Sequence, residues 1–305
     1  MFDRVKLPES VKIVEVGPRD GLQNEKQLIS LQAKIQLIDE LALAGVKFIE
    51  TGSFVSPKWV PQMADSAMVF KSLNRRAGVC YSALTPNLQG FAAALDAGVD
   101  EVAIFGSASE SFSQKNINCS VAESLARFQP LVEQARLQGM QVRAYVSCVL
   151  GCPYEGDIAP TTVATLAKAL FDMGCYEVSL GDTIGTGTPS KTAALLDAVL
   201  PLLSPDKIAV HFHDTFGQAI ANILVALQYG ISVIDSSVAG LGGCPYAKGA
   251  AGNVATEDVV YMLNGMNIST GIDLIKLCKA GDKIMQQLGR TTQSKAALAI
   301  LSSIP

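Results

Sequence analysis

The chain contains 305 residues, of which 49% are hydrophobic and 17% are charged, and its net charge is −4. A chain of this length buries about three quarters of its unfolded surface, which indicates a large globular core. Neither charge sign forms a long run, and no apolar run approaches the roughly 18 residues of a membrane helix. Nucleic acid and membranes are therefore not expected as partners, and a small molecule is the expected ligand.

The N-terminal stretch MFDRVKLPESVKIVE carries charges where a signal peptide needs an apolar run, and the seven cysteines include no C-x-x-C pair. These features favour reduced thiols and a cytoplasmic location.

Short apolar or β-branched runs alternate with helical patterns along the chain. Eight such runs are present: VKIVEVG from Val11, KFIETG from Lys47, GVCYSAL from Gly78, EVAIFG from Glu101, QVRAYVSC from Gln141, YEVSLGD from Tyr176, IAVHFHD from Ile208 and SVIDSSV from Ser232. Helical patterns such as SLQAKIQLIDELALAG lie between them. Eight βα units predict the α/β class and a closed (β/α)8 TIM barrel, which typically needs about 250 residues.

The remaining length predicts additional C-terminal helices. The stretch GIDLIKLCKAGDKIMQQLG is typical of a helix beyond the eighth unit, and no Pro/Gly/Ser-rich linker marks a second domain. We therefore expect residues 1–305 to form a single barrel domain with a helical extension from about residue 265. A doubly wound sheet is disfavoured because GPRDGLQNE after the first run is neither a G-x-G-x-x-G fingerprint nor a P-loop.

The only two histidines, His211 and His213, stand two positions apart at the end of the seventh run. On a strand such residues point to the same face roughly 6–7 Å apart, so both are expected to enter the barrel mouth, where TIM-barrel chemistry occurs. Two imidazoles on one strand favour a divalent metal site, and the alternative is a pair of polar core residues.

Oxygen ligands must come from other strand ends. Asp20 follows the first run in EVGPRDGLQ, where glycine and proline shape a tight loop, and the alternative is an ordinary Asp-Gly turn. Arg19 beside it is either a solvated surface residue or a donor to a substrate oxygen that becomes negative in the transition state. Glu50 is expected to close the second strand and Asp182 the sixth. Both are candidate active-site acids, and Asp182 is equally typical of a loop-ordering group.

The stretch GLGGCPYAKGAAGN, residues 240–253, follows the eighth run and contains five glycines. It is typical of a mobile lid whose glycines absorb dihedral changes on closure. Cys244 within it is a candidate proton donor or acceptor. Asn253 at its end could supply an amide oxygen to the metal or cap the following helix.

The blocks GPRDGLQNE, SFVSPKWVPQMAD, GDTIGTGTP, HFHDTFGQAIANI and GLGGCPYAKGAAGN resemble those of 3-hydroxy-3-methylglutaryl-CoA lyases and extend over about residues 11–264. The resemblance implies a (β/α)8 barrel, a divalent cation, usually Mg²⁺ or Mn²⁺, and cleavage of the thioester into acetoacetate and acetyl-CoA. It also suggests a homodimer. One block departs from the family pattern, because ETGSF stands where a small residue and Thr are expected before SF. The departure bears on substrate preference.

The resemblance assigns roles to the candidate residues by motif. The implied metal ligands are Asp20, His211, His213 and Asn253. The implied catalytic residues are Arg19 as the charge-stabilising group, Glu50 and Asp182 as acids, and Cys244 as the lid thiol that protonates the enolate carbon. His211 or a neighbouring acid is expected to take the hydroxyl proton. Lys58 and Lys248 are either contacts for the acyl-CoA substrate or solvated lysines.

Three alternative functions stay open. The nearest is a related metal-dependent Claisen-type synthase, which usually carries a long C-terminal regulatory region, whereas this chain ends about forty residues after its eighth unit. The second is an aldolase or decarboxylase with the same metal core. The third is a barrel that binds acyl-CoA without turnover, which would leave Arg19, Glu50 and Cys244 without a purpose.

Overall fold

A computed structural model describes residues 7–243 and 252–303, and its strands form a closed barrel in the order of the sequence. All neighbouring strands are parallel, with β1 and β8 pairing to close the ring. The strands are β1 Lys12–Glu15, β2 Phe48–Ser53, β3 Cys80–Leu84, β4 Glu101–Ser107, β5 Gln141–Ser147, β6 Glu177–Asp182, β7 Ile208–Phe212 and β8 Val233–Ser236. Each overlaps one of the eight runs, so the predicted (β/α)8 barrel is confirmed.

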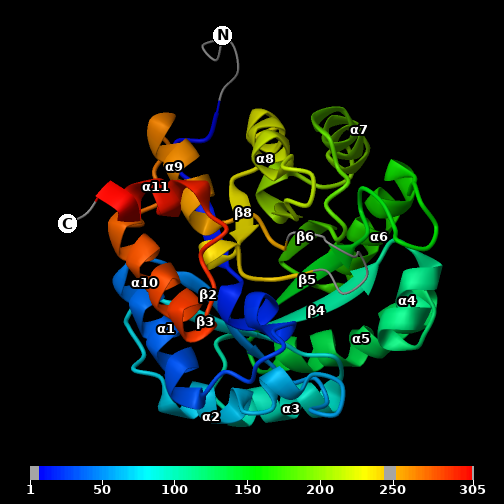
Figure 1. Ribbon diagram of the computed structural model, residues 1–305. Coiled ribbons are helices and arrows are strands. Elements are labelled where there is room, and N and C mark those ends of the chain that lie inside the picture. Colours follow the sequence, from blue (N-terminus) through cyan, green and yellow to red (C-terminus); the bar gives the residue numbers. More distant parts are fainter. Residues whose placement is uncertain (1–6, 244–251, 304–305) are drawn as a thin grey trace.

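Helices surround the strands on all sides (Figure 1). The α-helices are α1 Leu31–Leu43, α2 Ser66–Ser72, α3 Leu88–Asp96, α4 Glu110–Ile117, α5 Val121–Leu137, α6 Pro160–Met173, α7 Pro189–Val199, α8 Ala219–Gln228, α9 Thr256–Gly265, α10 Leu274–Gln287 and α11 Lys295–Ser303. The short helical turns are η2 Gly17–Gly21, η3 Pro61–Met63, η4 Pro205–Lys207 and η5 Val238–Gly240.

Helix α1 illustrates how local sequence sets these elements. The Ser30 side chain accepts a hydrogen bond from the Ala33 amide at the helix start, and the apolar residues Leu37 and Leu41 are buried. The helix is followed by Gly45 at φ +100°, where an added Cβ would lie 2.3 Å from a backbone oxygen. Only glycine fits this tight exit toward β2.

The C-terminal helices extend the ring of helices. Helix α10 packs beside α1 (Figure 1), where Lys283 Nζ lies 2.6 Å from Glu40 Oε1 and the Asp273 amide donates to the Ala44 carbonyl. The additional C-terminal helices that the sequence predicts are therefore present. Within the described ranges, no helix is long and apolar enough to cross a bilayer.

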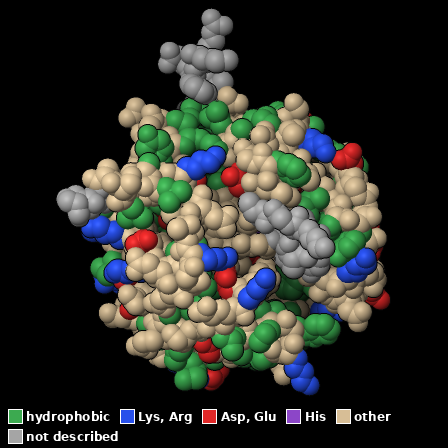
Figure 2. All heavy atoms as spheres, in the orientation of Figure 1, with side chains coloured by type: hydrophobic (Ala, Val, Ile, Leu, Met, Phe, Trp, Pro, Cys, Tyr) green, Lys and Arg blue, Asp and Glu red, His purple; other side chains and the backbone are tan. Residues whose placement is uncertain are grey.

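Side chains alternate along each strand between two environments. On β5, Val142, Ala144 and Val146 belong to the large apolar cluster beneath the helices, whereas Arg143 and Tyr145 lie on the other face, inside the barrel. The barrel interior therefore contains buried charges, which the apolar layer around it isolates from solvent. On the surface in Figure 2, charged side chains of both signs are scattered and neither forms a continuous field.

Candidate active site

Three predicted ligands converge at the carboxyl ends of β1 and β7. Asp20 lies in η2, directly after β1, His211 lies in β7, and His213 follows that strand. One ligand atom from each residue can be chosen so that all three lie within 4.8 Å of one another. The two imidazole centroids are 5.5 Å apart. The structure thus brings together side chains that are almost two hundred positions apart in sequence.

The electrostatics of the cluster suit a cation. Burial opposes ionisation of Asp20, but nearby Arg19 and the two histidines outweigh it and lower the pKa of this carboxyl to about 2. Burial, together with His211, lowers the pKa of His213 to about 4, so its ring is neutral at physiological pH. Nδ1 of His213 is buried and has no hydrogen-bond partner among the described residues. A buried ring nitrogen of this kind is an open ligand position.

Asn253 joins the same cluster. It forms an isolated antiparallel bridge with His213, and its Nδ2 donates to Asp20 Oδ2 at 2.8 Å and to the Leu241 carbonyl at 3.2 Å. It is 5% exposed. Its amide therefore contacts a proposed metal ligand directly, which a residue serving only as a helix cap would not do. One carboxylate, two imidazoles and one amide form a donor set that fits a divalent cation.

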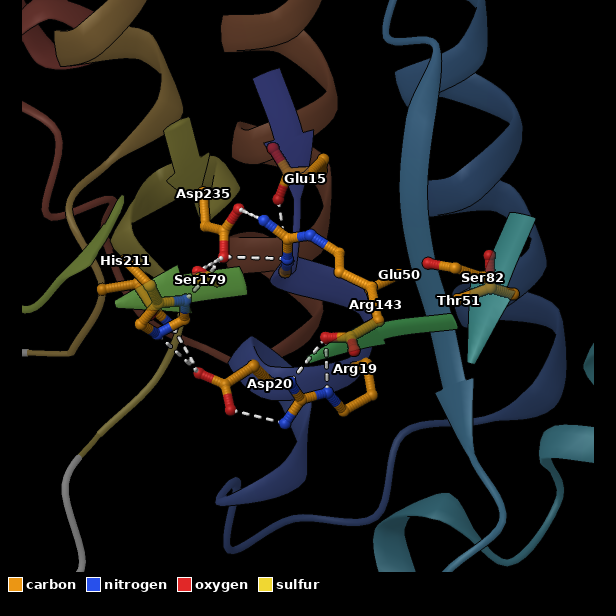
Figure 3. A network of polar contacts seen from close by, with 12 residues as sticks. Glu15, Arg19, Asp20, Glu50, Thr51, Ser82, Arg143, Ser179, His211 and Asp235 are labelled. Carbon is orange, nitrogen blue, oxygen red and sulfur yellow. Dashed lines mark hydrogen bonds and ion pairs between the residues drawn. The ribbon is translucent and has the colours of Figure 1, made fainter. Parts of the chain in front are cut away.

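Arg19 lies between two carboxylates (Figure 3). Its Nε donates to Glu50 Oε2 at 2.6 Å, and its Nη1 donates to Asp20 Oδ1 at 2.7 Å. Its guanidinium carbon is 5.6 Å from the centre of the Tyr145 ring. Burial disfavours the charge, but Glu50 and Asp20 raise the pKa of Arg19 still further above its ordinary value. Arg19 is therefore a fixed, buried cation beside the cluster, and the solvated-surface alternative is wrong.

Glu50 occupies a different position from the expected one. It is the third residue of β2 and does not close the strand, because pairing with β3 continues to Ser53 across a register shift between Glu50 and Gly52. Burial raises the pKa of Glu50 despite the opposing effect of Arg19. Oε1 of Glu50 is buried without a partner among the described residues. One oxygen thus holds Arg19, and the other is free to accept a proton or hydrogen bond.

Asp182 ends β6 as expected, but its oxygens serve the following loop. Oδ1 accepts from the Thr186 amide at 3.2 Å and Oδ2 accepts from the Gly187 amide at 2.8 Å. Burial raises the pKa of Asp182 to about 6, against these amide contacts. In the described structure Asp182 does not join the Asp20 cluster. The remaining candidates Cys244 and Lys248 lie outside the described residues, and Lys58 is exposed.

Sequence reasoning missed a second charged network deeper in the barrel. Asp235 on β8 accepts from both Arg143 terminal nitrogens, at 2.7 and 3.1 Å, and from Ser179 Oγ at 2.7 Å (Figure 3). Arg143 Nε donates to Glu177 at 2.6 Å. Burial disfavours the Asp235 charge, but Arg143 and His211 outweigh it, and the pKa of Asp235 falls well below its usual range. The sequence signal was present, since charges occupy inward positions of otherwise apolar strands.

Two further buried acids support the turn η5, which precedes the glycine-rich stretch. Glu15 accepts from the Val238 amide and from the Thr256 hydroxyl, and Glu257 accepts from the Ala239 amide, a residue at φ +59°. Burial raises the pKa of Glu15 to about 7 and that of Glu257 to about 8. These carboxyls hold the backbone of η5 in place by accepting its amide hydrogens.

Comparisons with known proteins agree with this geometry. The family model described as HMGL-like matches residues 10–284. A 3-hydroxy-3-isohexenylglutaryl-CoA/hydroxy-methylglutaryl-CoA lyase of Pseudomonas aeruginosa is 60% identical over 98% of this chain and 99% of its own. A mouse protein named 3-hydroxy-3-methylglutaryl-CoA lyase, cytoplasmic, is 59% identical over 96% of this chain and 85% of its own.

One solved relative contains a ligand. The structure of an HMG-CoA lyase from Acinetobacter baumannii in complex with coenzyme A and 3-methylmalate superposes with a TM-score of 0.91, at 37% identity, over 95% of both chains. The names of similar lyases place some in the cytoplasm and others in mitochondria.

Proposed function

This chain belongs to the HMGL-like family, and we propose that it is a metal-dependent lyase that cleaves 3-hydroxy-3-methylglutaryl-CoA to acetoacetate and acetyl-CoA. The observation that carries the proposal is the convergence of Asp20, His211 and His213 beside the buried cation Arg19 at the catalytic end of the barrel. Relatives named as this lyase, one of them solved with coenzyme A, support the substrate class.

The four residues that would hold the cation are Asp20, His211, His213 and Asn253, and Mg²⁺ or Mn²⁺ is the proposed ion. The fit rests on the unpartnered Nδ1 of His213 and on the mixed oxygen and nitrogen donor set. When bound, such a cation supplies Lewis-acid polarisation of the substrate oxygens and lowers the pKa of the C3 hydroxyl.

The reaction removes the proton from the C3 hydroxyl and breaks the C2–C3 bond. C3 becomes the ketone carbon of acetoacetate, and the bonding electrons pass to the thioester as an enolate, which then takes a proton at carbon to give acetyl-CoA. Arg19 faces the developing negative oxygen, and Glu50 and Asp20 fix its orientation before substrate binds. Such preorganisation avoids reorganisation during the reaction.

Two proton transfers accompany the cleavage. The hydroxyl proton passes to His211 or to a neighbouring acid, among which Glu50 offers an oxygen with no partner in the described structure. We propose that Cys244 returns a proton to the enolate carbon. Asp182 contributes by ordering the loop after β6, where its carboxylate accepts from two backbone amides.

A longer C3 substituent is a second candidate feature of the substrate. The relative from P. aeruginosa is named for an isohexenyl as well as a methyl glutaryl thioester, at 60% identity. The departure ETGSF begins on β2, where Glu50 contacts Arg19 of the site. Parallel assays with both thioesters would decide between a methyl-specific and a broader pocket.

The remaining assignments are a cytoplasmic location, a homodimer and one barrel domain over residues 1–305. The six described cysteines are free, which supports a reducing compartment. Size-exclusion chromatography with light scattering tests the dimer, and limited proteolysis tests whether α9 to α11 separate from the barrel.

The main test is acetyl-CoA release from 3-hydroxy-3-methylglutaryl-CoA by metal-stripped protein, with Mg²⁺ or Mn²⁺ added back, beside His213→Ala. Turnover should return with metal and be lost in the variant. A folded, metal-loaded protein without turnover would contradict the lyase assignment and favour the synthase or aldolase alternatives.

A further inference from the structure

The imidazole of His211 lies between two carboxylates. Its Nδ1 is 3.3 Å from Asp235 Oδ2 on the interior side, and its Nε2 is 3.9 Å from Asp20 Oδ2 on the mouth side (Figure 3). His211 and Asp235 are register partners on the adjacent strands β7 and β8. The pairing of two rigid strands therefore holds their side chains on the same interior face, and no loop is involved.

Asp235 is itself held by three hydrogen bonds from two residues. The Arg143 fork grips both of its oxygens, Ser179 Oγ donates to one of them, and the residue is 1% exposed. Arg143 is held in turn by Glu177, at 2.6 Å from its Nε. A carboxylate in a guanidinium fork is ionised and can only accept hydrogen bonds.

An acceptor facing Nδ1 selects one form of the neutral imidazole ring. Nδ1 must carry the hydrogen, and Nε2 then presents its lone pair toward Asp20 and the mouth. A metal ligand needs this lone pair, and partners of this kind orient ligating histidines and raise their basicity.

We propose that Asp235, anchored by Arg143 and Ser179, is the positioning residue that fixes the ring orientation and tautomer of His211 for divalent-metal binding. Asp235 does not touch the substrate and acts through His211. The inference rests on the proposed metal site, and it extends that site to a layer of the barrel that the family motifs in the sequence do not include.

The chain offers a matched control. Glu177 also pairs with Arg143, so Glu177→Gln and Asp235→Asn each remove one carboxylate partner of the same buried arginine. Of these two carboxylates, only Asp235 contacts His211. If Asp235 has a purely structural role, both variants should lose similar amounts of metal affinity. If it positions His211, Asp235→Asn alone should weaken metal binding.

The first experiment measures Mn²⁺ affinity by calorimetry on the full chain. Asp235→Asn should bind Mn²⁺ about 10–100-fold more weakly than the wild type, and Glu177→Gln should stay within about threefold of it. Ser179→Ala removes one hydrogen bond to Asp235 without changing charge, and it should show a smaller loss in the same direction. Equal affinities of Asp235→Asn and Glu177→Gln would overturn the proposal.

The second experiment reads the tautomer on the wild type, and a variant serves only to assign the signals. Because the chain has only two histidines, ¹⁵N-histidine NMR of tag-free, metal-free wild-type protein resolves the ring nitrogens directly. At a pH where both rings are neutral, one histidine, assigned by its absence in His211→Gln, should carry its proton on Nδ1. A proton on Nε2 would overturn the proposal. Failure of the wild type to bind Mn²⁺ would instead count against the proposed metal site, and the tautomer would still decide the role of Asp235.

Discussion

The barrel contains two buried charged regions that differ in how fully they are paired. In the interior network, Arg143 has two carboxylate partners, and both oxygens of Asp235 accept hydrogen bonds. At the mouth, Nδ1 of His213 and Oε1 of Glu50 are buried without partners among the described residues. A saturated network supports its neighbours, whereas unpaired buried polar atoms mark the place where a ligand completes the pairing.

Removing the central interior cation should produce the largest effect. Arg143→Met leaves Asp235 as a buried charge without its fork, and it should cost about 3–5 kcal/mol in the free energy of unfolding. Urea denaturation measures the loss. The control Lys71→Met breaks an exposed pair with Asp96 and should leave the free energy of unfolding nearly unchanged. Similar losses in both variants would show that the interior network does not stabilise the barrel.

Substitutions at the barrel mouth should lower activity more than stability. Arg19→Lys keeps the charge but cannot bridge Glu50 and Asp20 with the same fork, so kcat should fall about 10²–10³-fold. Steady-state kinetics measure the loss, with Arg127→Lys on the exposed face of α5 as control. A kcat within a few-fold of the wild type would remove Arg19 from the charge-stabilising role.

At the turn η5, which follows β8, stability should depend on pH. The folded pKa of Glu257 is about 8, well above its ordinary value of 4.5, so the folded state retains a proton that the unfolded chain releases. The free energy of unfolding of the wild type therefore falls as the pH rises from about 4.5 to 8. Glu257→Gln has no such proton, and its stability relative to the wild type should rise by a few kcal/mol across this range.

Thermal melts of both proteins at several pH values measure how this difference in stability changes with pH. Glu123→Gln is the control, because an exposed carboxylate that accepts from the Ser120 amide has a lowered pKa and cannot give the same rise. A constant difference between Glu257→Gln and the wild type over this pH range would contradict the burial effect.

Asp182 should give the smallest effect. Asp182→Asn retains one of two acceptors for the Thr186 and Gly187 amides, so it should cost about 0.5–2 kcal/mol, as does the loss of a helix cap. Hydrogen exchange at the Gly187 amide should accelerate. A fall in kcat of more than about 100-fold without loss of stability would place Asp182 among the catalytic residues instead.

Much of the fold was predictable because each strand is a short apolar run that ends near a glycine or a polar turn. The period of these runs is a local property, and so all eight strands were located correctly. The exact end of β2 was not predictable, because pairing with β3 beyond Glu50 depends on a register shift that only the neighbouring strand sets. The predicted end of β2 at Glu50 was therefore wrong by three residues, because the strand ends at Ser53.

The sequence by itself determined the eight βα units, the family motifs and the placement of His211 and His213 two positions apart at the end of one run, because all of these depend on spacing along the chain. Tertiary structure alone decided which buried charges meet. Arg143 and Glu177 are register partners on the adjacent strands β5 and β6, whereas Asp235 lies on β8, and closure of the barrel brings it to them. Burial then makes their mutual pairing obligatory, since an unpaired charge inside the barrel would cost several kcal/mol.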